Sequence, residues 1–193
     1  MNDKYSCFEE LTKSEIEGLH YQISLDCLGD SAFVIVAPHG GTIEPGSGEI
    51  ARAIASNKFA WYLFESKRIH DESYVSLHIT SHLFDEPQCL GLVKNYNWVV
   101  TIHGCNDSKE IVYLGGLESQ LISSVAESLD SFGIPNSDDC KRFPGTNRNN
   151  LCNKGCKGKG LQVEVSVPLR EPKKRHLLVK ALRKGLEGFL IKY

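Results

Sequence analysis

The stretch FVIVAPHGGTIEPGSGEIARAIA, residues 33–55, indicates the fold more clearly than any other part of the chain. Five apolar residues, typical of a buried strand, run into Pro38, and a short helical pattern begins near Gly48. His39, two glycines and Glu44 stand between the strand and the helix. Ligands of open α/β sheets gather beyond the carboxyl ends of the strands, so functional groups are expected in this turn.

Short β-type runs alternate with helical patterns along the rest of the chain, and no repeat or linker divides it. We expect strands, the first two joined as a hairpin, over residues 21–27, 32–38, 59–65, 74–80, 97–104, 110–116 and 161–167. We expect helices over residues 48–55, 119–133 and 172–192. Residues 138–160 form a long irregular stretch that is typical of a functional loop. The pattern predicts a single α/β domain, residues 1–193, with a mixed, mostly parallel open sheet flanked by helices.

The composition is typical of a soluble globular protein. Of the 193 residues, 41% are hydrophobic and 24% are charged, and the net charge is −2. A net charge this close to zero gives no positive electrostatic field that would attract nucleic acid. No apolar run approaches the ~20 residues of a membrane span. Residues 1–18 lack the apolar core of a signal peptide. We therefore expect a soluble protein made in the cytoplasm, with a monomer favoured and with no nucleic-acid or membrane partner. Action outside the cell after lysis stays open.

Three of the seven cysteines, Cys140, Cys152 and Cys156, lie close together in the sequence. The spacing of Cys152 and Cys156 suits a metal site or a disulfide, but a structural zinc ion usually needs four ligands in paired short spacings. No cysteine shares a recognisable motif with a histidine, so we expect none to be catalytic. Whether any of these three cysteines form a disulfide is an open question, because the cytoplasm disfavours disulfides and release from a cell permits them.

Two histidines and two glutamates carry the strongest chemical signal. His39 and His103 each end a predicted strand, and Glu44 follows in the turn after His39. If the two strands are neighbours, these groups form a His2Glu set, which with one water is a ligand set of catalytic zinc hydrolases. Alternatively, each histidine is a polar residue at a strand end whose ring nitrogens form hydrogen bonds with backbone groups. Glu164 stands within an apolar strand, where it is either a catalytic base or a residue on the exposed face.

His78 and His82 are a competing pair within the predicted strand 74–80 and just beyond it. On a continuous strand their side chains would lie ~13 Å apart, too far to bind one metal. We expect His78 to lie beside the site or in the core, and His82 at the surface or the rim of the site.

Five motifs, in this order, resemble the phage-type poly-γ-glutamate hydrolases: VIVAPHGGTIEPGSGEIARAI, LHITSHLFDEP, VVTIHG, CNKG and GLQVEVSVPLR. The resemblance runs from about Tyr5 to Arg170. It implies a zinc carboxypeptidase-like fold and one zinc ion per chain, with His39, Glu44 and His103 as the ligands. It also implies that Glu164 is the catalytic glutamate.

The resemblance implies a zinc-dependent amidohydrolase that cleaves γ-glutamyl amide bonds in poly-γ-glutamate, an anionic polymer. Arg148, Lys154 and Arg170 are candidates to hold the free carboxylates of the polymer. Lys154 stands where the family pattern leads us to expect arginine, and lysine offers a point charge instead of a two-pronged grip. Two alternatives remain: a zinc acylase acting on a small N-acyl amino acid, and a non-catalytic binding module.

Overall fold

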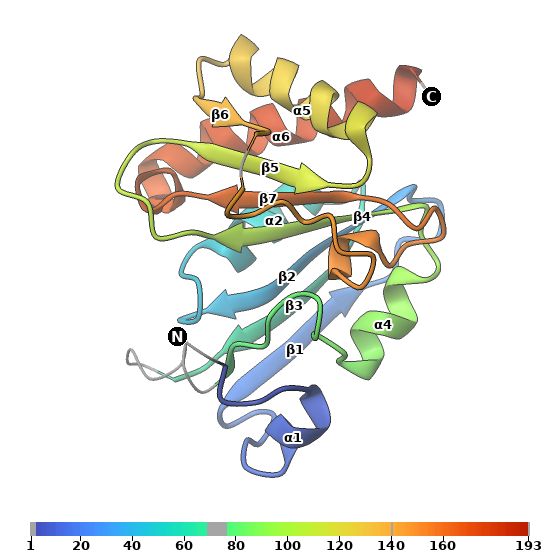
Figure 1. Cartoon of the computed structure of the whole chain (residues 1–193), viewed down its shortest axis with the longest axis vertical. Helices are drawn as coiled ribbons and strands as arrows, with labels where there is room; N and C mark the ends of the chain where they lie inside the picture. Colours follow the sequence, from blue (N-terminus) through green and yellow to red (C-terminus); the bar gives the residue numbers. More distant parts are fainter. Residues whose placement is uncertain (1–2, 69–76, 140, 193) are drawn as a thin grey trace.

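In the part of the chain that the computed structural model describes, residues 3–68, 77–139 and 141–192, seven strands form one sheet (Figure 1). Their order across the sheet is β1-β3-β2-β4-β7-β5-β6. The strands are β1 (Tyr21–Asp26), β2 (Phe33–Gly41), β3 (Ala60–Ser66), β4 (Trp98–Gly104), β5 (Val112–Gly116), β6 (Asn136–Ser137) and β7 (Leu161–Val165). Only the β1–β3 and β5–β7 pairs are antiparallel among those described. The expected mixed, mostly parallel sheet is therefore confirmed.

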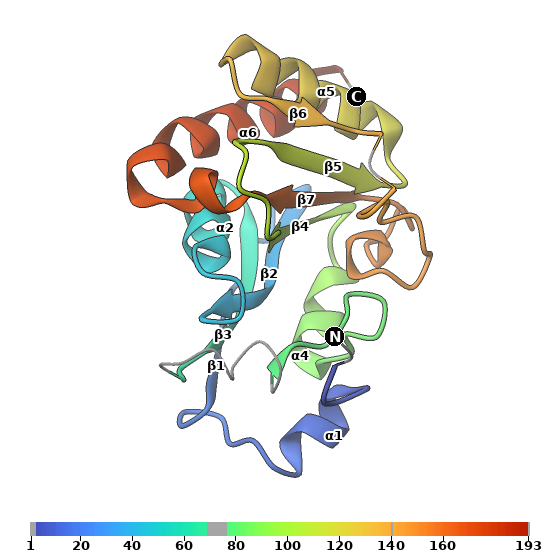
Figure 2. The ribbon, with the colours of Figure 1, turned by 60° about the vertical axis from the view of Figure 1, so that its left-hand side comes forward.

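Helices cover both faces of the sheet, as Figure 2 shows. The described helices are α1 (Phe8–Thr12), α2 (Ser47–Ala55), α4 (Pro87–Val93), α5 (Ser119–Ser131) and α6 (Pro172–Lys192). One apolar cluster joins the sheet to α2, α5 and α6, and a second joins the opposite face to α1 and α4. No described helix is long and apolar enough to span a membrane.

The alternation of side chains along β4 and β7 places His103 and Glu164 on the side of the sheet that α4 covers. Ile102 on β4 and Val163 on β7 belong to the cluster under α2, α5 and α6. Their chain neighbours, His103 and Glu164, therefore face the opposite side, because successive side chains of a strand alternate. The two residues are also paired in register across β4 and β7. The sheet thus places both side chains next to each other.

The prediction that residues 21–27 and 32–38 pair as a hairpin is wrong. The first strand, β1, pairs antiparallel with β3, while β2 lies between β3 and β4. The cause is burial: Phe33, Val34 and Ile35 are all inaccessible to solvent, so β2 has both faces covered and occupies the middle of the sheet. Exposed positions along β1 suit it to the edge.

The described part of the strand expected over residues 74–80 does not form a strand. Residues 74–76 lie outside the described residues, and His78–Thr80 have no regular secondary structure. The Thr80 N–H donates to the carboxylate of Asp3, 2.6 Å away, instead of to a neighbouring strand. The ~13 Å separation predicted for His78 and His82 on a strand therefore does not apply.

Candidate metal centre

The side chains of three candidate ligands converge at the carboxyl ends of β2 and β4. His39 Nδ1 lies 3.1 Å from Glu44 Oε1 and 3.2 Å from His103 Nδ1. His103 Nδ1 lies 3.5 Å from Glu44 Oε2. All three residues are buried. They meet because β2 and β4 are adjacent and parallel, which was the condition for the site expected from the sequence.

The glycine-rich turn brings Glu44 back toward His39. Gly41 has a φ of +66°, and a Cβ there would overlap the backbone carbonyl of Ser66 on β3, so only glycine fits. The Glu44 N–H then donates to the His39 carbonyl at 2.9 Å, which closes the turn. The turn therefore places the carboxylate beside the imidazole that precedes it by five residues.

The donor atoms fit a zinc ion in both identity and spacing. Zinc binds histidine nitrogen and carboxylate oxygen at about 2.0–2.2 Å, and tetrahedral angles then place two ligand atoms about 3.4 Å apart. The two imidazole nitrogens lie 3.2 Å apart, and each lies near one oxygen of Glu44, 3.1 Å for His39 and Oε1 and 3.5 Å for His103 and Oε2, so these separations lie around that value. A catalytic zinc site has three protein ligands, and this set provides three.

Each of these three residues is held by a second contact. His39 Nε2 donates to the carbonyl oxygen of Ile79 at 2.9 Å, which leaves the Nδ1 lone pair directed at the site. His103 Nε2 lies 3.2 Å from the hydroxyl of Ser81. Glu44 Oε2 accepts a hydrogen bond from the Gly104 N–H at 2.9 Å.

These contacts also shift the charge states of the buried groups. Burial alone would raise the pKa of Glu44, but the imidazoles of His39 and His103 hold that pKa well below its ordinary value. Burial alone would lower the pKa of His103, but the hydrogen bond and charge of Glu44 raise it. The site therefore keeps its carboxylate ionised.

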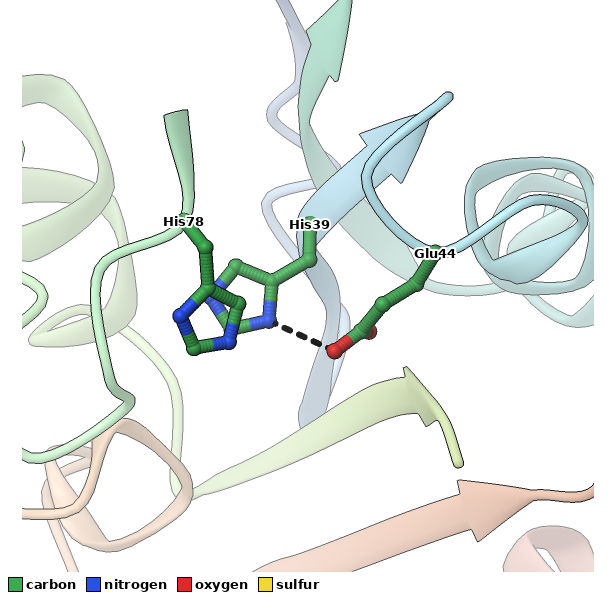
Figure 3. A group of neighbouring side chains, drawn as sticks. All are labelled: His39, Glu44 and His78. Atoms are coloured by element: carbon green, nitrogen blue, oxygen red, sulfur yellow. Dashed lines mark hydrogen bonds and ion pairs between the residues drawn. The ribbon is translucent and has the colours of Figure 1, made fainter. Parts of the chain in front are cut away.

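A fourth group, His78, packs against His39 (Figure 3). Its ring centroid lies 4.1 Å from that of His39, and a ligand atom of His78 lies within 4.8 Å of those of His39 and Glu44. These three residues therefore form an alternative group that could hold a metal ion. Burial lowers the pKa of His78 to about 4. The expectation that His78 lies beside the site matches this position.

Glu164 lines a cavity of about 870 Å³ together with the three candidate ligands. Its side chain is buried, and burial raises its pKa to about 7. The amide of Gln162 donates to Glu164 Oε1 at 3.2 Å, and Asn150 Nδ2 donates to Gln162 Oε1 at 2.8 Å. This hydrogen-bonded chain, which the sequence did not indicate, orients the carboxylate toward the cavity.

Arg170 also lines the cavity, and its guanidinium contacts backbone. It donates to the carbonyl oxygens of Pro45, Val165 and Cys105 at 2.6, 3.1 and 3.2 Å. Two of these residues directly follow the segments that carry Glu44 and His103. Arg170 therefore ties both ligand-bearing loops to the end of β7.

The other basic candidates of the long loop lie outside the cavity lining. Arg148 is exposed, and Lys154 donates to Asn149 Oδ1 at 3.1 Å. Arg142, from the same loop, does line the cavity and lies over the ring of Phe143, 4.9 Å from its centroid. Nothing in the local sequence distinguishes Arg142 from its basic neighbours, because the loop has no periodic pattern.

The described cysteines are free thiols. Cys152 is buried and Cys156 is exposed, while Cys140 lies outside the described residues. Cys105 lines the cavity, but burial raises its pKa to about 11, which keeps the thiol protonated near neutral pH.

A His2Glu set at the carboxyl ends of parallel strands, with a buried carboxyl group beside it, is an arrangement found in catalytic zinc hydrolases. The model of the family "Poly-gamma-glutamate hydrolase" matches residues 5–184. The chain belongs to this family.

A curated relative and two solved structures support this assignment. The SPbeta prophage-derived protein YoqZ of Bacillus subtilis (strain 168) is 40% identical over 171 residues, which cover 87% of this chain and 60% of YoqZ. The structure of a bacteriophage poly-gamma-glutamate hydrolase has a TM-score of 0.93 and 25% identity and covers both chains fully. The zinc-free apo form of YndL has a TM-score of 0.88 and 28% identity, and the match covers 96% of this chain and 98% of that one. The fold also matches a solved "Putative carboxypeptidase A" from Shewanella denitrificans, with a TM-score of 0.50, 11% identity and coverage of 89% of this chain and 61% of that one, so the expected carboxypeptidase-like α/β fold is confirmed.

Proposed function

We propose that the chain is a zinc-dependent hydrolase that cleaves γ-glutamyl amide bonds in poly-γ-glutamate. The observation that carries the proposal is the convergence of His39 Nδ1, Glu44 and His103 Nδ1 at zinc-like spacings in a chain of this family. The named activity of the bacteriophage relative supports the substrate, and the zinc-free label of the YndL structure supports the metal. One zinc ion per chain is part of the proposal.

A zinc ion bound to these three residues would supply a Lewis acid that polarises the scissile carbonyl and lowers the pKa of water. Glu164 accepts the proton of the attacking water and passes it to the leaving amine, so that one water is consumed and a carboxylate and an amine are released. Burial raises its pKa to about 7 in the metal-free protein, and a zinc ion nearby would lower that pKa, which keeps the carboxylate ionised to accept the proton near neutral pH. Gln162 keeps Oε1 of that carboxylate fixed during the transfer.

Basic groups around the cavity are proposed to hold the free carboxylates of the polymer. Arg170 uses three of the five N–H donors of its guanidinium on backbone carbonyls, and Arg142 lies at the exposed side of the cavity. Arg148 and Lys154, on the same loop but outside the cavity lining, would contact residues of the polymer farther from the scissile bond.

The proposal is tested by incubating the protein with poly-γ-glutamate and measuring chain length by size-exclusion chromatography. Zinc-loaded protein should shorten the polymer, a chelator should stop the reaction, and added zinc should restore it. Poly-α-glutamate, which has the same charge but α-linked amides, should stay intact. Chelator-insensitive cleavage would refute zinc dependence, and cleavage of N-acylglutamate without any effect on the polymer would favour a small-substrate acylase.

A further inference from the structure

We propose that Asp3 is a positioning residue of the metal centre, because it holds the first half of residues 78–81, here called the supporting segment, against the histidine ligand His39. The inference rests on the proposed function, since it assumes that His39 and His103 bind the metal. Asp3 itself is remote in sequence from all three proposed ligands.

The supporting segment contacts both imidazoles. The Ile79 carbonyl accepts the hydrogen bond of His39 Nε2 at 2.9 Å, and the Ser81 hydroxyl lies 3.2 Å from His103 Nε2. His78 adds a tilted ring contact with His39, whose centroid is 4.1 Å away (Figure 3). One short segment therefore orients both histidines, and such outer contacts usually decide how tightly a site binds its metal.

Side-chain contacts replace strand pairing in holding the first half of this segment. Residues 78–80 have no regular structure, and Asp3 Oδ2 accepts both the backbone N–H and the hydroxyl of Thr80 at 2.6 Å. Asp3 Oδ1 lies 2.7 Å from His78 Nδ1. The second half is fixed separately, because the Ser81 carbonyl accepts from the Leu151 N–H at 3.1 Å. Asp3 thus determines the position of the half that contacts His39.

The charge of Asp3 also determines which nitrogen of His78 carries the proton. A carboxylate only accepts hydrogen bonds, so neutral His78 carries its proton on Nδ1 and presents the Nε2 lone pair. Figure 3 shows that second nitrogen directed toward Glu44. In Asp3→Asn, the amide oxygen still accepts from the Thr80 N–H, and the amide NH2 faces His78 Nδ1 as a donor. The proton of His78 then moves to Nε2, beside the metal ligands.

The test is the zinc affinity of Asp3→Asn and Asp3→Ala, measured by competition with a chromophoric chelator. Both variants should bind zinc about 10- to 100-fold more weakly than the wild type, Asp3→Ala because the contacts with Thr80 and His78 are lost, and Asp3→Asn because the proton of His78 moves to Nε2 beside the ligands. Saturating zinc should restore hydrolysis, which a misfolded variant would not recover. Glu10→Gln is the matched control, because Glu10 is a nearby carboxylate that contacts only Ser6 among the described hydrogen bonds.

Thermal unfolding of the metal-free proteins shows whether each variant is folded. Asp3→Asn retains the Thr80 contact, so the zinc affinity of this variant decides the outcome if Asp3→Ala does not fold. Wild-type zinc affinity in folded Asp3→Asn would overturn the inference and leave the proposed function standing. A wild-type chain that binds no zinc would overturn the proposed function, and the inference with it.

Discussion

Replacing Glu164 with glutamine is expected to stabilise the metal-free protein at pH 8 by about 3 kcal/mol. Glu164 is 7% exposed, and burial raises its pKa from 4.5 to about 7, although His103 and Arg142 partly oppose that shift. Each tenfold change in proton affinity corresponds to about 1.4 kcal/mol. The ionised carboxylate therefore costs the folded state about 3 kcal/mol, and a neutral glutamine of the same shape avoids this cost.

The sign of the effect follows from proton binding. Between about pH 4.5 and pH 7 the folded protein holds a proton that the unfolded chain has released, so its stability falls as pH rises through this window. Above pH 7 the full cost is present, and below pH 4.5 it disappears because the carboxyl is protonated in both states. The stability difference between Glu164→Gln and the wild type should therefore shrink from about 3 kcal/mol at pH 8 to about 1 kcal/mol at pH 5.

The assay is urea unfolding of both chelated proteins, followed by tryptophan fluorescence at pH 5 and pH 8. Glu9→Gln is the control, because it removes the same charge at a side chain that is 84% exposed and lies outside the cavity lining. With zinc present, Glu164→Gln should retain the metal and lose about 10²–10⁴-fold in kcat. An equal stability difference at both pH values would refute the argument from burial, and full activity would remove Glu164 from the mechanism.

Three further predictions concern the metal ligands, the thiol in the cavity and the basic groups of the loop. His103→Ala should lose stoichiometric zinc as measured by atomic absorption, and normal zinc content would exclude His103 as a ligand. Cys105→Ser should keep the wild-type kcat, because a thiol with a pKa of about 11 is not ionised at neutral pH; a large loss would assign this thiol a chemical role. Arg142→Glu should raise KM for the polymer more than Arg148→Glu does, with a difference that decreases as salt screens exposed charges over a Debye length of ~10 Å at 0.1 M. Equal effects of the two reversals would contradict the placement of Arg142 at the cavity.

The central strand and its turn were predictable because their signals are local. The unbroken apolar run before Pro38 indicates a strand buried on both faces, and the glycines after His39 indicate a turn that crosses another backbone closely. The sequence left open whether Glu164 is a catalytic base or a residue on the exposed face of its strand, because local sequence does not state which face of β7 lies on the cavity. That depended on the pairing of β7 with β4.

The features that the sequence did not reveal depend on contacts between distant residues. The pairing of β1 with β3 is set by the burial of β2 between two other strands, whereas the link between residues 26 and 33 resembles a hairpin turn. The contact between Asp3 and Thr80 joins residues 77 positions apart and leaves no periodic pattern in either segment. Arg170 was expected to hold substrate because of its charge, but its contacts with three backbone carbonyls appear only in the folded chain.

The most direct test of the central claim is anomalous diffraction at the zinc edge from crystals of the protein soaked in zinc. We predict one strong peak per chain, bound by His39 Nδ1, Glu44 and His103 Nδ1 at about 2.0–2.2 Å. A peak held by His78 in place of His103, or no peak between these side chains, would contradict it.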